Sequence, residues 1–174
     1  MNEKFYELHK LGETLEEIHI NTSEENKNAA IALTKQARHS IDIFSQDMDA
    51  IIYNNKNFER SIFNLAKRHP NTKIRILTQN SKKAVQNGHR LIKLAQSITS
   101  SVFINNPSRE YKDEKSAFLI VDKLGLLYRP STNNRNYKAS LNFMAPQRAG
   151  KLLDYFNKTW EHSTPDLQVR RIYI

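Results

Sequence analysis

The sequence of 174 residues has no cysteine, no long apolar run, no internal repeat and no low-complexity segment. The lack of cysteine excludes disulfide bonds and thiolate metal ligands, and it agrees with a reducing compartment. No apolar run approaches the length that spans a bilayer. The first twelve residues are polar and mixed in charge, so they lack the apolar centre of a secretory signal. We therefore expect a cytoplasmic protein.

The composition is that of one folded domain. Hydrophobic residues make up 39% of the chain and charged residues 26%, and the length is enough to bury a core. Lysine and arginine total 27 against 18 aspartates and glutamates, which gives a formal net charge of +9. This excess favours acidic partners such as nucleic acid, anionic lipid or phosphorylated metabolites. The alternative is a protein from a lysine- and asparagine-rich proteome, whose charge reflects no specific partner.

We interpret residues 1–15 as a loosely attached N-terminal arm and residues 16–174 as a single α/β domain. The domain begins with a short strand at 16–21, where apolar and polar side chains alternate. A helix follows from an N-cap at Thr22 or Ser23, and acidic residues in its first turn suit the helix dipole.

The rest of the chain alternates between strand and helix patterns. Strands are predicted at 40–45, 73–78, 101–104, 116–122 and 126–128, with an edge strand at 168–174. Helices are predicted at 58–68, 88–97 and 145–161, with a short helix or turn at 49–55. This alternation gives the α/β class, with an open sheet flanked by helices. A hairpin near residue 120 makes the sheet mixed, and we expect it to be mostly parallel.

The order of these elements resembles one half of a phospholipase D-like protein. In that family a helix with a small and basic end leads into an alternating strand, which here is the segment 37–45 (ARHSIDIFS). A helix and a KIRIL strand follow, matched here by residues 73–77. The resemblance covers roughly residues 24–162. It extends to a poorly characterised bacterial branch of the fold that is sometimes fused to acetyltransferase domains.

The catalytic signature of that family is incomplete in this sequence. The family has His-x-Lys, four more residues and Asp, with Gly-Ser-x-Asn downstream, and its histidine is a nucleophile that becomes phosphorylated. With Asp122 aligned to the motif aspartate, Lys115 stands at the histidine position and Ala117 at the lysine position. Ser131 and Asn133 keep the Ser-x-Asn spacing, with proline in place of the glycine. We therefore predict no catalytic residues and no phosphodiesterase activity.

Polar residues at the strand ends predict a ligand site, because ligands of open α/β sheets bind at the carboxyl ends of strands. An arginine among hydroxyl and amide groups would suit a phosphate or a sugar. The predicted phosphate-binding residues at these ends are Ser45, Gln46, Gln79, Asn80, Tyr128, Arg129, Ser131 and Asn133. The alternative is that each is an ordinary turn residue.

The segment 87–90 (NGHR) opens a predicted helix and is a second candidate. Backbone N–H groups at a helix start favour an anion, to which His89 and Arg90 could add donors. His89 is also the best-placed substitute for the missing nucleophile. The alternative is a turn with a solvated basic pair. No two histidines have metal-ligand spacing, so we predict no metal and no cofactor.

Three functions follow from these observations. The first is a non-catalytic domain that binds a phosphate-bearing ligand, and nucleic acid is the ligand that we favour. Its bases could stack on Tyr128 and Tyr137, which lie among basic residues in the sequence. The second is an enzyme that attacks a phosphodiester through His89. The third is a protein-interaction domain. The resemblance also implies a homodimer, since members with a single motif pair two halves across a cleft.

Overall fold

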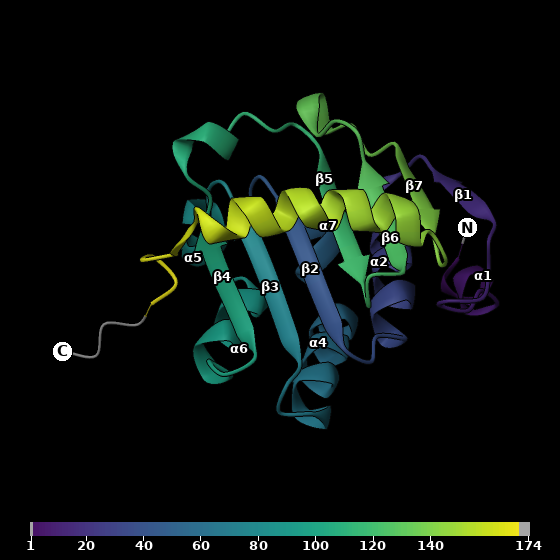
Figure 1. Ribbon diagram of the computed structural model, residues 1–174, viewed down its shortest axis with the longest axis horizontal. Helices are drawn as coiled ribbons and strands as arrows, with labels where there is room; N and C mark the ends of the chain where they lie inside the picture. The colour runs from purple at the N-terminus through teal and green to yellow at the C-terminus, as the bar shows by residue number, and fades with distance from the viewer. Residues whose placement is uncertain (1, 171–174) are drawn as a thin grey trace.

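Eight strands form one sheet in the computed structural model, which describes residues 2–170 (Figure 1). The strand order is β1-β7-β6-β5-β2-β3-β4-β8. The strands are β1 (Glu17–Ile20), β2 (Ser40–Ser45), β3 (Lys73–Thr78), β4 (Val102–Asn106), β5 (Ala117–Val121), β6 (Gly125–Arg129), β7 (Ala139–Asn142) and β8 (Thr164–Pro165). The predicted α/β class and mixed sheet are confirmed.

The parallel part of the sheet is smaller than expected. Within residues 2–170, only the pairs β2–β3 and β3–β4 are parallel, and the other five pairings are antiparallel. The reason is that β5, β6 and β7 follow one another as an up-and-down meander without crossover helices. Short connections of this kind allow only antiparallel pairing, whereas a parallel pair needs a long crossover.

Helices cover the two faces of the sheet unequally (Figure 1). One face carries α1 (Glu3–Glu7), α2 (Ser23–Lys35), α3 (Ala50–Tyr53), α4 (Lys56–Arg68), α5 (Lys82–Gln86) and α6 (Arg90–Ser97). The other face is crossed by α7 (Pro146–Glu161), as Figure 1 shows. No helix within the described part of the chain is long and apolar enough to cross a membrane.

Side chains alternate between the two faces along each strand, which separates two apolar cores. In β2, Ile41 belongs to the larger core beneath the six helices, whereas Phe44 belongs to the smaller core under α7. The buried Asp42 shares the α7 side, where Arg75 Nε donates to its Oδ1 at 2.7 Å. The Arg75 guanidinium also lies 4.9 Å from the Phe156 ring centroid. This pair connects two strands to α7.

The N-terminal segment packs more closely than the loosely attached arm that we expected. Tyr6 of α1 is fully buried, and burial raises the pKa of its hydroxyl to about 12. The backbone N–H of Leu11 donates to the side chain of Gln36, just after α2. These contacts join segments 25 residues apart, so no local pattern in residues 1–15 reveals them.

Most element boundaries agree with the prediction, to which the structure adds α1, α5, β7 and β8. The N-cap of α2 is Thr22, which forms a capping box with Glu25. The predicted edge strand at 168–174 lies partly outside the described residues. Its described part, 168–170, forms no strand, and β8 makes the pairing at that edge instead.

A tight turn joins β5 to β6 and is tied to the start of β2. Asp122 and Lys123 have positive φ angles of 52° and 62°, as the central residues of a type I′ hairpin turn do. The Asp122 carboxylate accepts hydrogen bonds from the backbone N–H groups of residues 38–40, at 2.7 to 2.9 Å. The aspartate that aligns with the catalytic motif therefore has an architectural role here.

Candidate ligand-binding site

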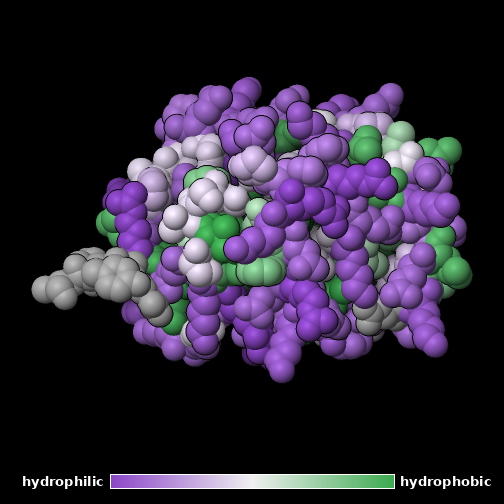
Figure 2. Space-filling model, turned by 90° about the horizontal axis from the view of Figure 1, so that it is seen from below, coloured by the Kyte–Doolittle hydropathy of each residue, from purple (hydrophilic) through white to green (hydrophobic). Residues whose placement is uncertain are grey.

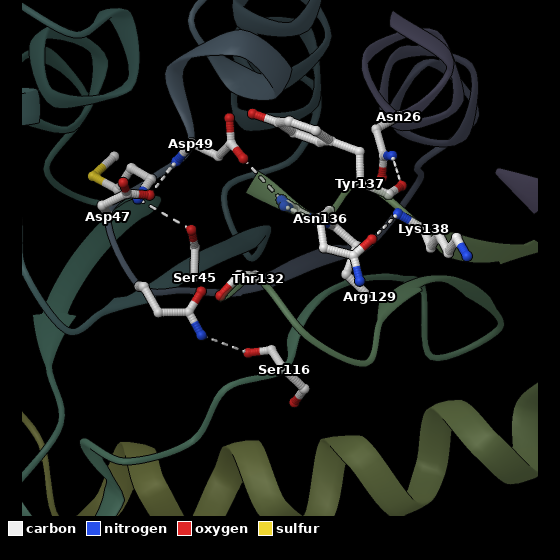
Figure 3. Close-up of polar contacts among 12 residues, drawn as sticks. Asn26, Ser45, Asp47, Asp49, Ser116, Arg129, Thr132, Asn136, Tyr137 and Lys138 are labelled. Carbon is white, nitrogen blue, oxygen red and sulfur yellow. Dashed lines mark hydrogen bonds and ion pairs between the residues drawn. The ribbon is translucent and has the colours of Figure 1, made fainter. Parts of the chain in front are cut away.

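A pocket of about 380 Å³ opens where β2 and β6 end, and we call it the strand-end pocket. Its lining residues are Ser45, Gln46, Asp47, Asp49, Ala50, Ile51, Arg129, Thr132, Arg135 and Tyr137. They come from the loop after β2 and from the segment between β6 and β7, which Figure 3 shows facing each other. Three of the predicted site residues, Ser45, Gln46 and Arg129, lie in this lining.

Arg129 is buried at the base of the strand-end pocket, where it is already paired. Its Nη1 donates to Asp49 Oδ2 at 2.8 Å and its Nη2 donates to the Asn136 carbonyl at 2.9 Å. The guanidinium lies 4.6 Å from the centroid of the Tyr137 ring. Its Nε is buried without a hydrogen-bond partner among residues 2–170. We predicted a phosphate ligand for Arg129, but Asp49 neutralises its charge within the pocket.

Glutamine side chains hold the start of β5 against the ends of β2 and β3. Gln46 Nε2 donates to the carbonyls of Glu114 and Ser116, each at 3.0 Å. Gln79 Nε2 donates to the same Glu114 carbonyl at 2.9 Å. Ser45 is buried, and its hydroxyl accepts a hydrogen bond from a backbone N–H three residues later. These hydrogen bonds occupy groups that the sequence assigned to a ligand.

The remaining strand-end residues lie outside the pocket lining. Tyr128 directly precedes Arg129 in β6 and therefore points to the opposite face, where it packs in the core under α7. Asn80 is exposed and caps the turn before α5. Ser131 accepts a hydrogen bond from the backbone N–H of Asn133, so the Ser-x-Asn pair stabilises its own turn. The eight predicted strand-end residues therefore do not form a single binding site.

His89 and Arg90 lie at the start of α6, outside the pocket lining. His89 is 1% exposed; its Nε2 contacts the Met48 carbonyl at 3.0 Å, and its Nδ1 accepts from the Leu91 N–H at 3.2 Å. These partners require a neutral ring protonated at Nε2. Arg90 is paired with Glu59 at 2.8 Å. The geometry therefore leaves neither ring nitrogen of His89 free for nucleophilic attack.

A known protein family matches most of the chain. Residues 22–172 match the family described as a domain of unknown function (DUF7931). The chain belongs to the DUF7931 family. No curated protein matches the sequence.

Solved structures show which fold this DUF7931 chain has. It is similar to TrmBL2, an archaeal chromatin protein, at 15% identity with a TM-score of 0.63, over 86% of this chain and 54% of that one. Nuc of Salmonella typhimurium, a phospholipase D family member, has 11% identity and a TM-score of 0.61 over 88% and 97% of the two chains. NucT from Helicobacter pylori has 16% identity and a TM-score of 0.58 over 88% and 100%. The chain thus spans about half of TrmBL2, and its fold is phospholipase D-like.

The motif positions of this DUF7931 chain lie beside the strand-end pocket with other side chains in them. Lys115, at the histidine position, is exposed, and its carbonyl accepts from the backbone N–H of Thr132 at 3.0 Å. Ala117, at the lysine position, is buried and pairs directly with Arg129 across β5 and β6. No group of three or more potential metal-ligating side chains lies together within residues 2–170.

The sequence prediction omitted Asp49, the partner of Arg129. Asp49 is 80 residues away from Arg129 along the chain, so nothing local indicates the pair. A partial signal did exist, because Asp47 and Asp49 follow Ser45 and Gln46 at the same strand end. The polar residues at this strand end already reach Asp47, and extending the strand-end rule by two more residues would have included Asp49.

The buried His89 predicts a specific pH dependence of stability. Burial lowers its pKa, so the folded state binds fewer protons than the unfolded state near and below the unfolded pKa of about 6.5. The free energy of unfolding should therefore fall as the pH drops through that range. We expect His89→Asn, which retains an N-cap, to lose about 1–3 kcal/mol at pH 7.5 because the Met48 carbonyl loses its partner. The variant should also lose less stability than the wild type between pH 7.5 and 5.5.

Urea unfolding at several pH values measures this difference. The control is His39→Asn, which replaces an exposed histidine and leaves the contacts of His89 in place. Parallel curves for the wild type and His89→Asn would contradict the assignment of a neutral, buried His89.

Proposed function

We propose that this chain is a cytoplasmic, non-catalytic phospholipase D-like domain that binds single-stranded nucleic acid at the strand-end pocket. The observation that carries the proposal is the set of exposed cations in the segments that line the pocket or contact its lining. Arg135 lines it, Lys115 is joined to the lining residue Thr132 by a backbone hydrogen bond, and Lys138 directly follows the lining residue Tyr137. Exposed cations of this kind attract a phosphate backbone.

The charge inside the pocket favours a nucleobase over a phosphate. Asp47 and Asp49 both line it, and Asp49 cancels the charge of Arg129. A phosphate placed inside would meet these carboxylates, whereas a base is uncharged and carries N–H donors that carboxylates accept. Tyr137 adds an aromatic ring to the same lining. A single strand could place a base in the pocket while its phosphates contact the neighbouring cations.

One of the similar structures supports this ligand class. TrmBL2 is described as a chromatin protein with a novel mode of DNA binding. The absence of catalysis is supported by Lys115 and Ala117 at the motif positions and by the occupied ring nitrogens of His89.

Binding of a fluorescent single-stranded oligonucleotide should weaken steeply with salt. With about three to five phosphate contacts, log K should fall against log salt with a slope of roughly −2 to −4. The combined variant Lys115→Gln, Arg135→Gln, Lys138→Gln should make that slope shallower by about 2, at about 0.7 for each lost contact. The matched control is Arg38→Gln, Lys73→Gln, Lys123→Asn, which removes the same charge from exposed residues at the other end of β2 and β3.

The same titration separates the competing functions. The oligonucleotide should remain intact, and turnover that is lost in His89→Asn would restore the enzyme hypothesis. If the wild type does not bind at low salt, the nucleic-acid proposal is wrong, and the protein-interaction hypothesis takes its place. If the two triple variants change the salt slope equally, the single strand is attracted by the overall positive charge and not by a specific site.

We also propose that the chain forms a homodimer, as its resemblance to single-motif members of the fold implies. A closed two-fold pair is the commonest soluble oligomer. Light scattering at high protein concentration should give twice the mass of one chain. A monomer mass throughout the concentration series would contradict the proposal.

A further inference from the structure

A second positively charged surface lies at the end of the sheet opposite the strand-end pocket. We call it the basic edge and define it by the exposed cations Arg38, Arg68, Lys73 and Lys123. Figure 2 views the molecule from this side and shows hydrophilic residues over most of the middle of the face. The exposed histidines His39 and His69 lie in the same loops.

Backbone contacts bring these cations together from three parts of the sequence. Ser40 at the start of β2 is the direct pairing partner of Lys73 at the start of β3. The carboxylate of Asp122 binds the N–H groups of residues 38–40, which places Lys123 beside Arg38. The backbone N–H of Thr72, next to Lys73, donates to the carbonyl of His69, which follows Arg68.

Few carboxylates belong to the basic edge, although Lys123 also interacts electrostatically with the buried Asp42, which is paired with Arg75. Asp122 is the one acidic residue in the segments 38–40, 68–73 and 122–124. Its two oxygens are occupied by three backbone N–H groups. Within residues 2–170, none of the four defining cations forms an ion pair with a carboxylate. The loops around the strand-end pocket differ, because aspartates there lie among the cations.

The side chains at the basic edge also limit the class of partner. The large exposed hydrophobic residues of the described chain are Leu8, Leu15, Ile51, Phe63 and Leu167, and none belongs to the segments of the basic edge. Protein interfaces have an apolar core and membrane-binding surfaces insert apolar groups, so neither fits well. These segments have no phenylalanine, tyrosine or tryptophan, and the exposed imidazoles of His39 and His69 are the aromatic rings that they offer. Exposed cations without large apolar side chains suit the phosphates of a duplex.

We propose that the basic edge binds the phosphate backbone of duplex nucleic acid without reading its sequence. The surface is separate from the strand-end pocket, so the protein would hold a duplex at one end of its sheet and a single strand at the other. The proposal goes beyond the single-strand function and does not depend on it.

The test is a salt titration of a short fluorescent duplex with two variants of equal charge. Removing three contacts with Arg38→Gln, Lys73→Gln, Lys123→Asn should make the slope of log K against log salt shallower by about 2 to 3, at about 0.9 for each duplex contact. Asparagine is chosen at position 123 because it tolerates a positive φ. The variant Lys115→Gln, Arg135→Gln, Lys138→Gln should leave duplex binding nearly unchanged. Circular dichroism confirms that both variants are folded.

The duplex and single-strand titrations have separate outcomes. Wild-type protein that does not bind duplex at low salt overturns this proposal, whatever the single-strand result. Equal losses of duplex binding in the two variants also overturn it, since that would indicate diffuse attraction. Binding to anionic phosphatidylglycerol vesicles in place of duplex would identify a membrane surface and overturn it as well.

Discussion

Replacing Arg129 with alanine should lower the free energy of unfolding by about 3–5 kcal/mol, the range for breaking a buried ion pair on one side. Arg129 is 5% exposed and its Nη1 lies 2.8 Å from Asp49 Oδ2. Truncation would leave the Asp49 carboxylate without its counter-charge and the Asn136 carbonyl without its donor. Tyr137 would also lose the guanidinium that lies against its ring. Urea unfolding followed by circular dichroism measures the change.

The matched control is Arg135→Ala in the same pocket. Arg135 is exposed and forms no ion pair within residues 2–170, so its loss should change stability by no more than about 0.5 kcal/mol. Asp49→Asn combined with Arg129→Ala should destabilise less than the sum of the two single changes, because the second change no longer leaves a charge unpaired. Similar, small effects of Arg129→Ala and Arg135→Ala would show that the buried pair contributes nothing.

This result also determines how ligand binding should be tested. A loss of binding in Arg129→Ala would reflect both a missing contact and a rearranged loop. Arg135, Lys115 and Lys138 are exposed, so their variants report binding with little change in folding. Arg129, the arginine that the sequence favours as a ligand contact, is therefore less informative in a binding test than Arg135.

Replacing Asp122 should have the second largest effect on stability. Its Oδ2 accepts from the Arg38 N–H, and its Oδ1 accepts from the N–H groups of His39 and Ser40. Hydrogen bonds to a charged group contribute about 1.5–3 kcal/mol each and do not add fully, so we expect Asp122→Ala to lose about 2–4 kcal/mol. Alanine also fits poorly at the positive φ of this position.

Two further variants separate the loss of the hydrogen bonds from the strain of the positive φ. Asp122→Gly tolerates the positive φ but removes every acceptor, so it should be more stable than Asp122→Ala by about 1 kcal/mol. Asp122→Asn keeps one oxygen and the shape but presents an amide N–H₂ to a backbone donor, so it should be the mildest change. Denaturant melts should give the order Ala, Gly, Asn from most to least destabilised. Equal effects of all three would indicate that the hydrogen bonds to residues 38–40 are unimportant.

The elements of the fold were largely predictable because each has a local physical cause. The alternation in SIDIFS and KIRILT predicted β2 and β3 at their observed bounds. The continuous apolar run before Asp122 predicted the central strand β5, which is buried on both faces. β7, with the sequence ASLN, has only one large apolar side chain, so its strand state depends on pairing with β1 and β6.

The candidate site was only partly predictable. The strand-end rule selected Ser45, Gln46 and Arg129, which do line one pocket. It also grouped Tyr128 with Arg129, although neighbouring residues of a strand point to opposite faces. That separation follows from the sequence once β6 is recognised. The burial of His89 does not, because its partner Met48 is 41 residues away.

The sequence by itself determined the α/β class, the positions of most strands and helices, the positive charge and the absence of the catalytic His-x-Lys pair. These depend on residue identity and on neighbours within a few positions. The tertiary structure alone decided which charges are paired: Arg129 pairs with Asp49 and Arg90 with Glu59, whereas the four cations of the basic edge form no ion pair within residues 2–170. The reason is that electrostatic interaction depends on distance in space and on burial, and a folded chain brings together residues that are far apart in sequence.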